Sequence, residues 1–446
     1  MSVTIDGPLD GEMRLRGNAV SSLLEVKTDG RVRPFTENGL AGTFDVSVDK
    51  AAFGALLGIP AGDGTMSAKM SVSGRSLTFE KLAGKIAAAA FEGRGSLELG
   101  ELYRIHGELA ADRIVGTAVL AAVVGATPQR ADALWSAEAF RRGPVAGLNG
   151  GIAIRAARLT LAPGVTATDA KAMMRITPNE VAFEDFKGML NGGRVAGELA
   201  LRAVSDGVAV KGRLDLKEVE AAVLPFEGHP VSGRFGLQID FEGSGRSPRA
   251  LVGSLGGNGA IAIEGAKFAG LHPGVFVQAI RAADQAPTLD AAKLAAVARQ
   301  ALDAGSLDVA HGDGVLTMAN GQVRLATMVA RAEGAEFTAT GHFDIATGQL
   351  DSRIALAGAQ PANAAGRPEI AVTLRGPVLS PKRAVDVSSL TGWLAFRAVE
   401  QQAKKLEAIE RSRALPSSAS PDGVPPADRN VGAPRPRTTG TDAAAA

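Results

Sequence analysis

The chain has 446 residues, enough for about two to four globular domains or for one elongated array of repeats. Its 48 basic and 47 acidic residues leave a net charge of +1. A chain so nearly neutral does not attract the negatively charged backbone of nucleic acid, so we expect no nucleic-acid partner. The absence of cysteine excludes disulfides, thiolate nucleophiles and cysteine-based metal sites.

The N-terminal segment, Met1–Pro8, lacks a basic region followed by an apolar run, so no signal peptide is predicted. The sequence also contains no stretch of about 20 apolar residues, so no transmembrane helix is predicted. The segment resembles the middle of a strand repeat, as expected of a chain that begins downstream of a missing anchor.

A short phrase recurs along the chain: glycine, any residue, apolar residue, any residue, apolar residue. Each copy predicts the start of a strand with one apolar face. Glycine is abundant, with 55 copies, as expected where many strands need tight turns. The copies begin at Gly42, Gly95, Gly197, Gly212, Gly259 and Gly341.

Alternation is strongest in Val208–Lys217 and Phe235–Glu242, where apolar side chains share one face and polar or charged ones share the other. Leu24–Lys27, Met66–Val72 and Ile370–Arg375 behave alike. One apolar face and one wet face are typical of antiparallel sheets.

The short phrase is part of a longer repeat. Phe79–Gly84 matches Phe183–Gly188, which starts 104 positions later (183 minus 79). Two predicted strands follow each copy, and then a predicted helix, Ile114–Val124 in the first and Lys217–Leu224 in the second. Val315–Leu356 resembles a third copy. Repeats at this scale indicate an array rather than a globular enzyme.

Further helices are predicted at Val48–Leu57, Ala131–Arg142, Gly274–Ala283 and Leu289–Leu302, where apolar residues recur at helical spacing. We expect these helices to cap an open end or edge of the sheet, because exposed edges invite aggregation.

Ser388–Arg413 is predicted as the last helix, with an apolar stripe along it. Its Trp393 and Phe396, near Lys404 and Lys405, allow two interpretations. The helix either packs on the end of the sheet or lies on a membrane as an amphipathic helix. Packing is favoured because the helix is not strongly cationic.

These elements predict a mainly β fold with short helices: an elongated antiparallel β-repeat array, curled into a groove and closed by helical caps. We expect a β-repeat with a helical cap at 1–142, a second β-repeat at 143–260, and a C-terminal β module at 261–387 with a helical insert at 270–304. A terminal amphipathic helix follows at 388–413. Residues 414–446 are rich in Pro, Ser, Ala and Gly and are predicted to be disordered.

No constellation for catalysis is found in the sequence. The closest two histidines, His311 and His342, are 31 positions apart, so no helical pair of metal ligands exists. No Gly-x-Ser-x-Gly elbow occurs. The segment His311–Gly314 is typical of a hairpin turn. We therefore interpret Asp313 as a turn residue and not as a catalytic residue. We therefore expect no catalytic residue, no metal, no cofactor and no enzymatic activity.

The order of these elements resembles the C-terminal, periplasmic part of the AsmA family over about Val3–Arg413. The likeness is carried by the repeated strands, by the segment Asp45–Leu57 and by the final module from Leu307 to the closing helix. The order Arg375-Gly376-Pro377, Pro381 and Val385-Asp386-Val387 is its most specific part.

The resemblance implies a twisted β-groove on the periplasmic side of a Gram-negative inner membrane, with phospholipid as its ligand. It implies roles in lipid transport, lipid homeostasis and outer-membrane assembly, with envelope-assembly proteins as candidate partners. Contact with the inner membrane is implied through an anchor. The sequence departs from the family in lacking the N-terminal membrane helix, so the chain is either a truncated product or not an autonomous transporter.

An apolar trough suits acyl chains, because each buried CH₂ contributes about 0.8 kcal/mol and a chain of roughly 14–16 carbons is held by about 10 kcal/mol without a specific contact. The predicted lining of the groove is Leu97, Leu99, Leu199, Leu201, Val208, Val210, Leu214, Leu216, Phe343 and Ile345.

Two other functions stay open. The first is a non-catalytic periplasmic scaffold or interaction protein for envelope assembly, whose apolar faces are closed against each other and bind nothing. The second is a glycan-acting enzyme, which needs clustered carboxylates on one face. Acidic residues here are instead scattered at strand tips, which disfavours the enzyme.

Overall fold

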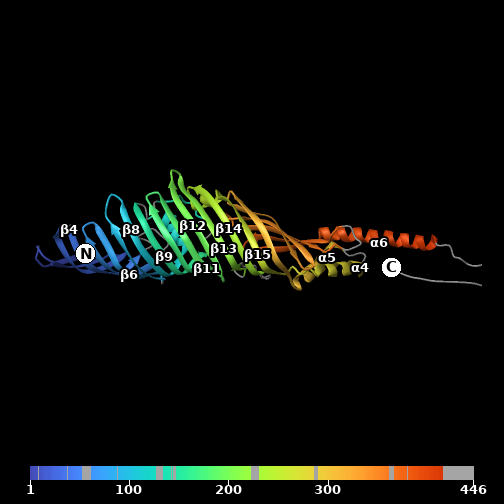
Figure 1. The fold of residues 1–446 in the computed structure, drawn as a ribbon, viewed down its shortest axis with the longest axis horizontal. Helices are drawn as coiled ribbons and strands as arrows, with labels where there is room; N and C mark the ends of the chain where they lie inside the picture. The colour runs from blue at the N-terminus through green and yellow to red at the C-terminus, as the bar shows by residue number, and fades with distance from the viewer. Residues whose placement is uncertain are drawn as a thin grey trace, which may run out of the picture. The chain divides into compact units, whose positions relative to one another are not determined.

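The computed structural model describes residues 1–8, 10–37, 39–52, 62–87, 89–126, 134–141, 143, 147–221, 231–285, 290–360, 366–378 and 380–414. Within these residues, 21 strands form one sheet, so the predicted mainly β class is confirmed. Neighbouring strands pair in chain order from β1 to β21, and those two edge strands do not pair with each other (Figure 1). The sheet is therefore open at both ends.

The strands are β1 (Ser2–Asp6), β2 (Met13–Val20), β3 (Leu24–Thr36), β4 (Gly39–Ala52), β5 (Asp63–Ser73), β6 (Ser76–Ile86), β7 (Ala89–Glu98), β8 (Tyr103–Val115), β9 (Leu148–Ala162), β10 (Val165–Thr177), β11 (Glu180–Leu190), β12 (Gly193–Val204), β13 (Gly207–Glu220), β14 (Val231–Gly245), β15 (Gly256–Ala269), β16 (Ser306–Ala319), β17 (Gln322–Ala332), β18 (Ala335–Asp344), β19 (Gln349–Gly358), β20 (Glu369–Pro377) and β21 (Lys382–Asp386). The helices are α2 (Gly116–Val124), α3 (Pro248–Gly253), α4 (Val275–Gln285), α5 (Ala291–Asp303) and α6 (Ser388–Ala414).

The chain divides into a first unit, Met1–Phe396, which holds the whole sheet, and a second unit, Arg397–Ala446. The expected subdivision of residues 1–387 into repeat modules stays a prediction. The expected disordered tail lies outside the described residues, apart from its first residue, Ala414.

One strand pair differs in direction from the rest. β8 and β9 are parallel, and the chain between them includes α2. Every other strand pair between the described residues is antiparallel. Two consecutive parallel strands need a long crossover connection between them, because a tight turn reverses the direction of the chain.

The longer repeat is visible in the strand positions. β6, β7 and β8 begin at residues 76, 89 and 103, and β11, β12 and β13 begin at 180, 193 and 207, each 104 residues later. β17, β18 and β19 begin at 322, 335 and 349, a further 142 residues on (322 minus 180). The pairing of β6 with β7 shifts register after Phe79, and that of β11 with β12 shifts after the matching Phe183. Val315–Leu356 is thus a third structural copy.

The recurring glycines lie inside strands and not at their starts, which corrects the expectation. Gly42 is the fourth residue of β4, and a Cβ there would lie 2.5 Å from the Arg31 carbonyl oxygen of β3. At Gly212 in β13, a Cβ would lie 2.5 Å from the ring of Phe241 in β14. The glycines allow close approach between strands and let aromatic rings lie across them.

Four predicted helices are confirmed, at α2, α4, α5 and α6. Asp290 caps α5 by accepting a hydrogen bond from the Lys293 backbone N–H at 2.7 Å, and Gly125, with φ of 63°, ends α2. These signals lie in the sequence itself, which explains why the predicted bounds are close.

Other helix predictions are wrong where residues are described. β4 continues to Ala52 and β13 to Glu220, so the predicted helices Val48–Leu57 and Lys217–Leu224 begin inside strands; residues 53–57 and 222–224 lie outside the described part. Residues 134–141 of the predicted helix Ala131–Arg142 are not helical. His311–Gly314 lies inside β16 and forms no hairpin turn. Strand pairing to both neighbours overrides local helical spacing in these segments.

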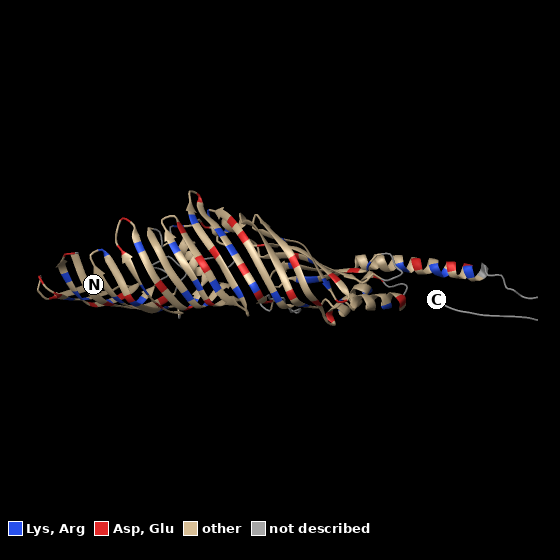
Figure 2. Ribbon diagram, in the orientation of Figure 1, with Lys and Arg blue, Asp and Glu red and all other residues tan. Residues whose placement is uncertain are grey.

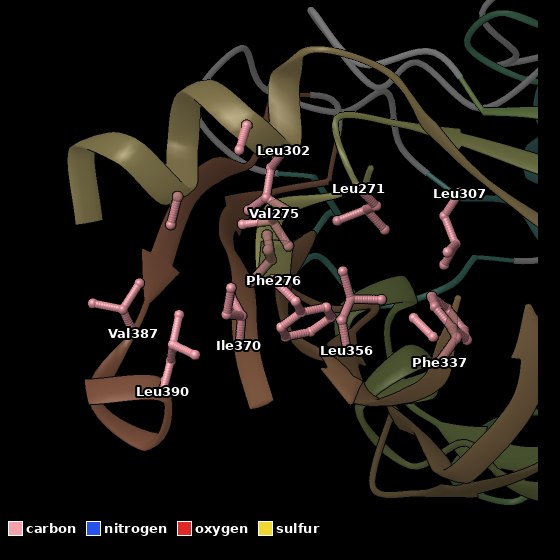
Figure 3. Close-up of a cluster of buried hydrophobic side chains, with 14 of the residues drawn as sticks. Leu271, Val275, Phe276, Leu302, Leu307, Phe337, Leu356, Ile370, Val387 and Leu390 are labelled. Carbon is pink, nitrogen blue, oxygen red and sulfur yellow. The ribbon is translucent and has the colours of Figure 1, made fainter. Parts of the chain in front are cut away.

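The main hydrophobic core lies at one end of the sheet. There α4, α5 and the first turns of α6 pack on the apolar side of β15–β20, and Phe276, Leu302 and Leu356 converge between helices and strands (Figure 3). The rings of Phe268 and Phe337 stack with centroids 5.1 Å apart. We call β15–β21 with α4, α5 and residues 388–396 of α6 the sealed region.

Candidate functional site: an apolar face along the sheet

The alternating strands place their apolar residues on one continuous side of the sheet, which we call the apolar face. The cross-strand register defines it between β1 and β8, because directly paired residues point to the same side. Its rows are Val3, Gly17, Thr28, Val46, Ala68, Leu82, Gly93 and Leu109; Ile5, Leu15, Gly30, Phe44, Met70, Phe79, Gly95 and Gly107; Met13, Val32, Gly42, Val72, Leu77, Leu97 and Ile105; and Ala19, Val26, Val48, Met66, Gly84, Phe91 and Ala111. These rows carry no charged side chain.

Among the described residues, no helix is joined to this face by a core cluster over β1–β7, which we call the open region. The described residues form four clusters of buried hydrophobic side chains, and none includes or packs against a residue of β1–β7. Val3 and Ile5 at the edge of this face are 50% and 54% exposed, and Met13, Val32, Val48 and Ala68 within it are 5–8% exposed. Phe337 in the sealed region is 1% exposed. The same sheet therefore has an open end and a sealed end.

The opposite side of the sheet is polar. Cross-strand ion pairs join Arg14 Nη2 to Asp29 Oδ2 at 2.7 Å, and Arg94 to Glu108 at 3.1 Å, and Figure 2 shows both charges distributed along the strands. The hydrogen bond and the charge of Arg14 lower the pKa of Asp29, and Arg94 lowers the pKa of Glu108 in the same way. Such exposed ion pairs keep this side of the sheet solvated. They add little to the free energy of unfolding.

One hollow over this part of the sheet is lined by a row of the apolar face, Val48, Met66, Gly84, Phe91 and Ala111, and by the neighbours of these residues along each strand. It measures about 760 Å³ and spans β4–β8, with Ser47, Thr65, Ser67, Lys85 and Glu92 in its lining.

A different cavity lies on the apolar face in the middle of the sheet, and we call it the α2 pocket. It measures about 270 Å³, with Val119 and Leu120 of α2 on one side and strands β8–β14 on the other. The strand lining includes Ile114, Ile154, Ala156, Leu159, Leu161, Ala172, Phe183, Phe186, Leu199, Leu214 and Phe241.

Residues 134–141, which follow α2, bind several strand ends. Trp135 Nε1 donates to the Ile345 carbonyl oxygen at 2.9 Å, just after β18. The Phe140 backbone N–H donates to the Arg246 carbonyl oxygen at 2.9 Å, next to β14. Phe140 also packs with Leu120 of α2 against β12–β14. These contacts hold the segment after α2 against the sheet.

The structure brings most of the predicted lining residues together. Leu199, Leu201, Val208 and Val210 share one cluster with side chains of α2. Leu216 belongs to a neighbouring cluster, against which Leu214 packs, and both Leu199 and Leu214 line the α2 pocket.

The other predicted lining residues lie apart from that group. Leu97 belongs to the apolar face of the open region, between Leu77 and Ile105. Leu99 follows the end of β7 and is 37% exposed. Phe343 pairs with Val323 and Leu350 in β18, and Ile345 follows that strand. Whether any of these residues contacts lipid stays a prediction.

Sequence reasoning missed the residues of α2 and β9–β11 that line the α2 pocket. Apolar residues recur around Ile152–Ile154 and Phe183 at the spacing of the other strands, so the sequence pattern could have predicted which face of each strand is apolar. The position of α2 over the sheet could not be predicted from the sequence pattern, because it depends on the parallel β8–β9 crossover.

No set of three or more His, Cys, Asp or Glu residues in the described part of the chain is placed to hold a metal ion. Among the same residues, no helix combines the length and the apolar character needed to cross a bilayer.

Comparison with protein families finds a match to the AsmA family over residues 124–328. That range runs from the end of α2 through most of β17 and includes β9–β14, six of the seven strands that line the α2 pocket. Comparisons with curated proteins and with solved structures give no match. Residues 124–328 are therefore similar to the AsmA family, as the order of the sequence elements predicted.

Proposed function

We propose that the protein handles phospholipid in the cell envelope by holding acyl chains against its apolar face. The observation that carries this proposal is the uncharged face of β1–β8, which no described core cluster joins to a helix over β1–β7. Soluble proteins rarely leave large apolar surfaces exposed unless something binds them. Acyl chains match such a face because they need no hydrogen-bond partner and gain about 0.8 kcal/mol per buried CH₂.

The AsmA match supports a place in the envelope. On that basis we propose that the protein acts on the periplasmic side of the inner membrane, in lipid homeostasis and outer-membrane assembly. Contact with the inner membrane and with envelope-assembly proteins belongs to the same proposal. The proposed activity requires no catalytic group, because lipid transfer along a surface breaks no covalent bond.

Photo-crosslinking from neighbouring residues on opposite sides of one strand tests the proposal. Benzoylphenylalanine at Leu97 faces the apolar side, and at Ser96 the polar side. The full chain is incubated with vesicles of phosphatidylethanolamine and phosphatidylglycerol, irradiated and analysed by mass spectrometry. We expect about tenfold more lipid adduct at Leu97 than at Ser96, which corresponds to about 1.4 kcal/mol of preference. Equal capture at both positions, or none, contradicts the proposal.

The sealed region favours a second candidate for part of the molecule. Its apolar face is filled by the protein's own side chains, such as Leu302 and Leu356, which are fully buried. A non-catalytic scaffold for envelope assembly would show this arrangement along its whole length. Failure to capture lipid anywhere on the open region would make the scaffold the better interpretation.

A further inference from the structure

The α2 pocket is continuous with the apolar face of the open region. Leu109 of β8 ends one row of that face and pairs directly with Ile154 of β9, which lines the pocket. Along the next register position, Ala111 pairs with Ala156, another lining residue. A ligand moving along the rows from β1 therefore reaches the pocket without crossing a polar barrier.

The volume of the pocket restricts its contents. Its lining is contributed by α2 and by seven strands, β8 to β14, whose apolar side chains converge on it. A volume of about 270 Å³ corresponds to about nine water molecules. An apolar cavity of this size is too small for a whole lipid and fits one acyl chain.

The pocket interior offers almost no polar partner. Its charged lining residues, Lys171, Glu198 and Arg213, are exposed, and Arg213 Nε lies 3.7 Å from Asp240 Oδ1 on the polar side of the sheet. The remaining side chains that line it are aliphatic or aromatic. Water in such a space would lack the hydrogen-bond partners that ordered buried water needs.

Helix α2 supplies an independent observation. Its nine residues, GTAVLAAVV, include no charged side chain, and none of them is buried. A helix that is apolar on every side is ordinarily buried in a core. Here α2 lies over the sheet with apolar surface still accessible, as expected of a cover whose partner is a bound molecule.

We propose that the α2 pocket is a binding site for one acyl chain of a lipid, at which α2 holds the chain against β8–β14. This site rests on the proposed function, because the open region would deliver the lipid. It assigns a defined resting position to a ligand that would otherwise be free to move along the face.

The test uses two photo-crosslinking positions in the full chain, with the same vesicles of phosphatidylethanolamine and phosphatidylglycerol. Benzoylphenylalanine replaces Val119 of α2 in one variant and Phe44 of the open region in the other. Ala172→Phe fills the pocket, because Ala172 lines it from β10 and is only partly buried. Ala196→Phe is the matched control, because Ala196 lies on the opposite side of β12 from the lining residue Leu199.

We expect lipid adducts at both positions, a loss of about tenfold at Val119 in Ala172→Phe, and no change at Phe44 in that variant. Ala196→Phe should leave both signals unchanged. If Ala172→Phe fails to fold by circular dichroism, Ala172→Leu replaces it. Capture at Phe44 without capture at Val119, or capture at Val119 that Ala172→Phe does not reduce, overturns the pocket assignment and leaves the proposed function intact. No capture at either position contradicts both.

Discussion

The open region and the sealed region are built from the same repeating strands but differ in what covers them. β6–β8 and β17–β19 have matching starts, yet side chains of β17–β19 belong to a large core and those of β6 and β7 belong to none. The difference comes from α4, α5 and the start of α6, which pack only on the second set. An alternating strand thus provides an apolar face, and separate elements decide whether that face is filled.

The largest expected effect tests whether the sealed region depends on its core. Phe337→Ala should lower the free energy of unfolding by about 3–5 kcal/mol, because it leaves a cavity beside Phe268. Urea unfolding followed by the fluorescence of Trp393, which is 9% exposed in the same cluster, measures the loss. Phe44→Ala in the open region, followed by circular dichroism, should cost about 1 kcal/mol. Equal losses would break the comparison.

A smaller effect is expected from strand contact in the open region. In Gly42→Ala the new Cβ would lie 2.5 Å from the Arg31 carbonyl oxygen and 3.1 Å from the Phe44 ring. We expect a loss of about 1–3 kcal/mol in urea unfolding, because backbone cannot move aside cheaply. Gly236→Ala is the control, since its Cβ would meet only the Leu216 carbonyl oxygen, at 3.4 Å. A neutral Gly42→Ala would show that the open region tolerates strand separation.

The segment after α2 links the middle of the sheet to the sealed region. Trp135→Phe removes the hydrogen bond from Nε1 to the Ile345 carbonyl oxygen and should cost about 1 kcal/mol. The variant retains Trp393 as its single tryptophan, so the urea midpoint of the sealed region is measured without interference. An unchanged midpoint would mean that this contact does not support the sealed region.

The smallest effect is pH-dependent and belongs to the start of α6. The Ser388 hydroxyl and backbone N–H donate to Asp386 Oδ1 at 2.6 and 3.0 Å, and these bonds lower the pKa of Asp386. A carboxylate with a lowered pKa stabilises the fold above its unfolded pKa of about 3.9, and that contribution is lost as the pH falls through the lowered value. Asp386→Ala should therefore cost under about 1 kcal/mol at pH 7 and progressively less below pH 4, measured by urea unfolding. A constant difference across this range would contradict the assignment.

Several features were predictable because they depend on local patterns. Alternation identified the strands around Val208–Lys217 and Phe235–Glu242, and the Phe79 and Phe183 segments identified the repeat. Packing is found only for the start of the last helix, where Trp393 is buried in the sealed region. Phe396, Val399, Leu406 and Ile409 are 50–65% exposed, so the choice between packing and membrane contact for the rest of the helix stays a prediction. Each of these outcomes follows from side chains close together in the sequence.

Other features depend on contacts between distant segments and were missed. The helical spacing of Val48–Ala52 and Lys217–Glu220 was overridden by pairing with neighbouring strands. Glycines such as Gly42 were assigned to strand starts, although their role is close approach to the next strand. The α2 pocket could not be predicted, because the pattern of α2 does not reveal that a parallel crossover places it over β8–β14.

The parallel β8–β9 pair has a consequence for how the repeats are oriented. β6 and β11 are five strands apart, and five antiparallel steps would point them in opposite directions. The single parallel step cancels that reversal. β11 and β17 are six antiparallel steps apart, and an even number of such steps makes the two strands point in the same direction. All three copies therefore share one polarity, so matching strands begin at the same edge of the sheet in every copy.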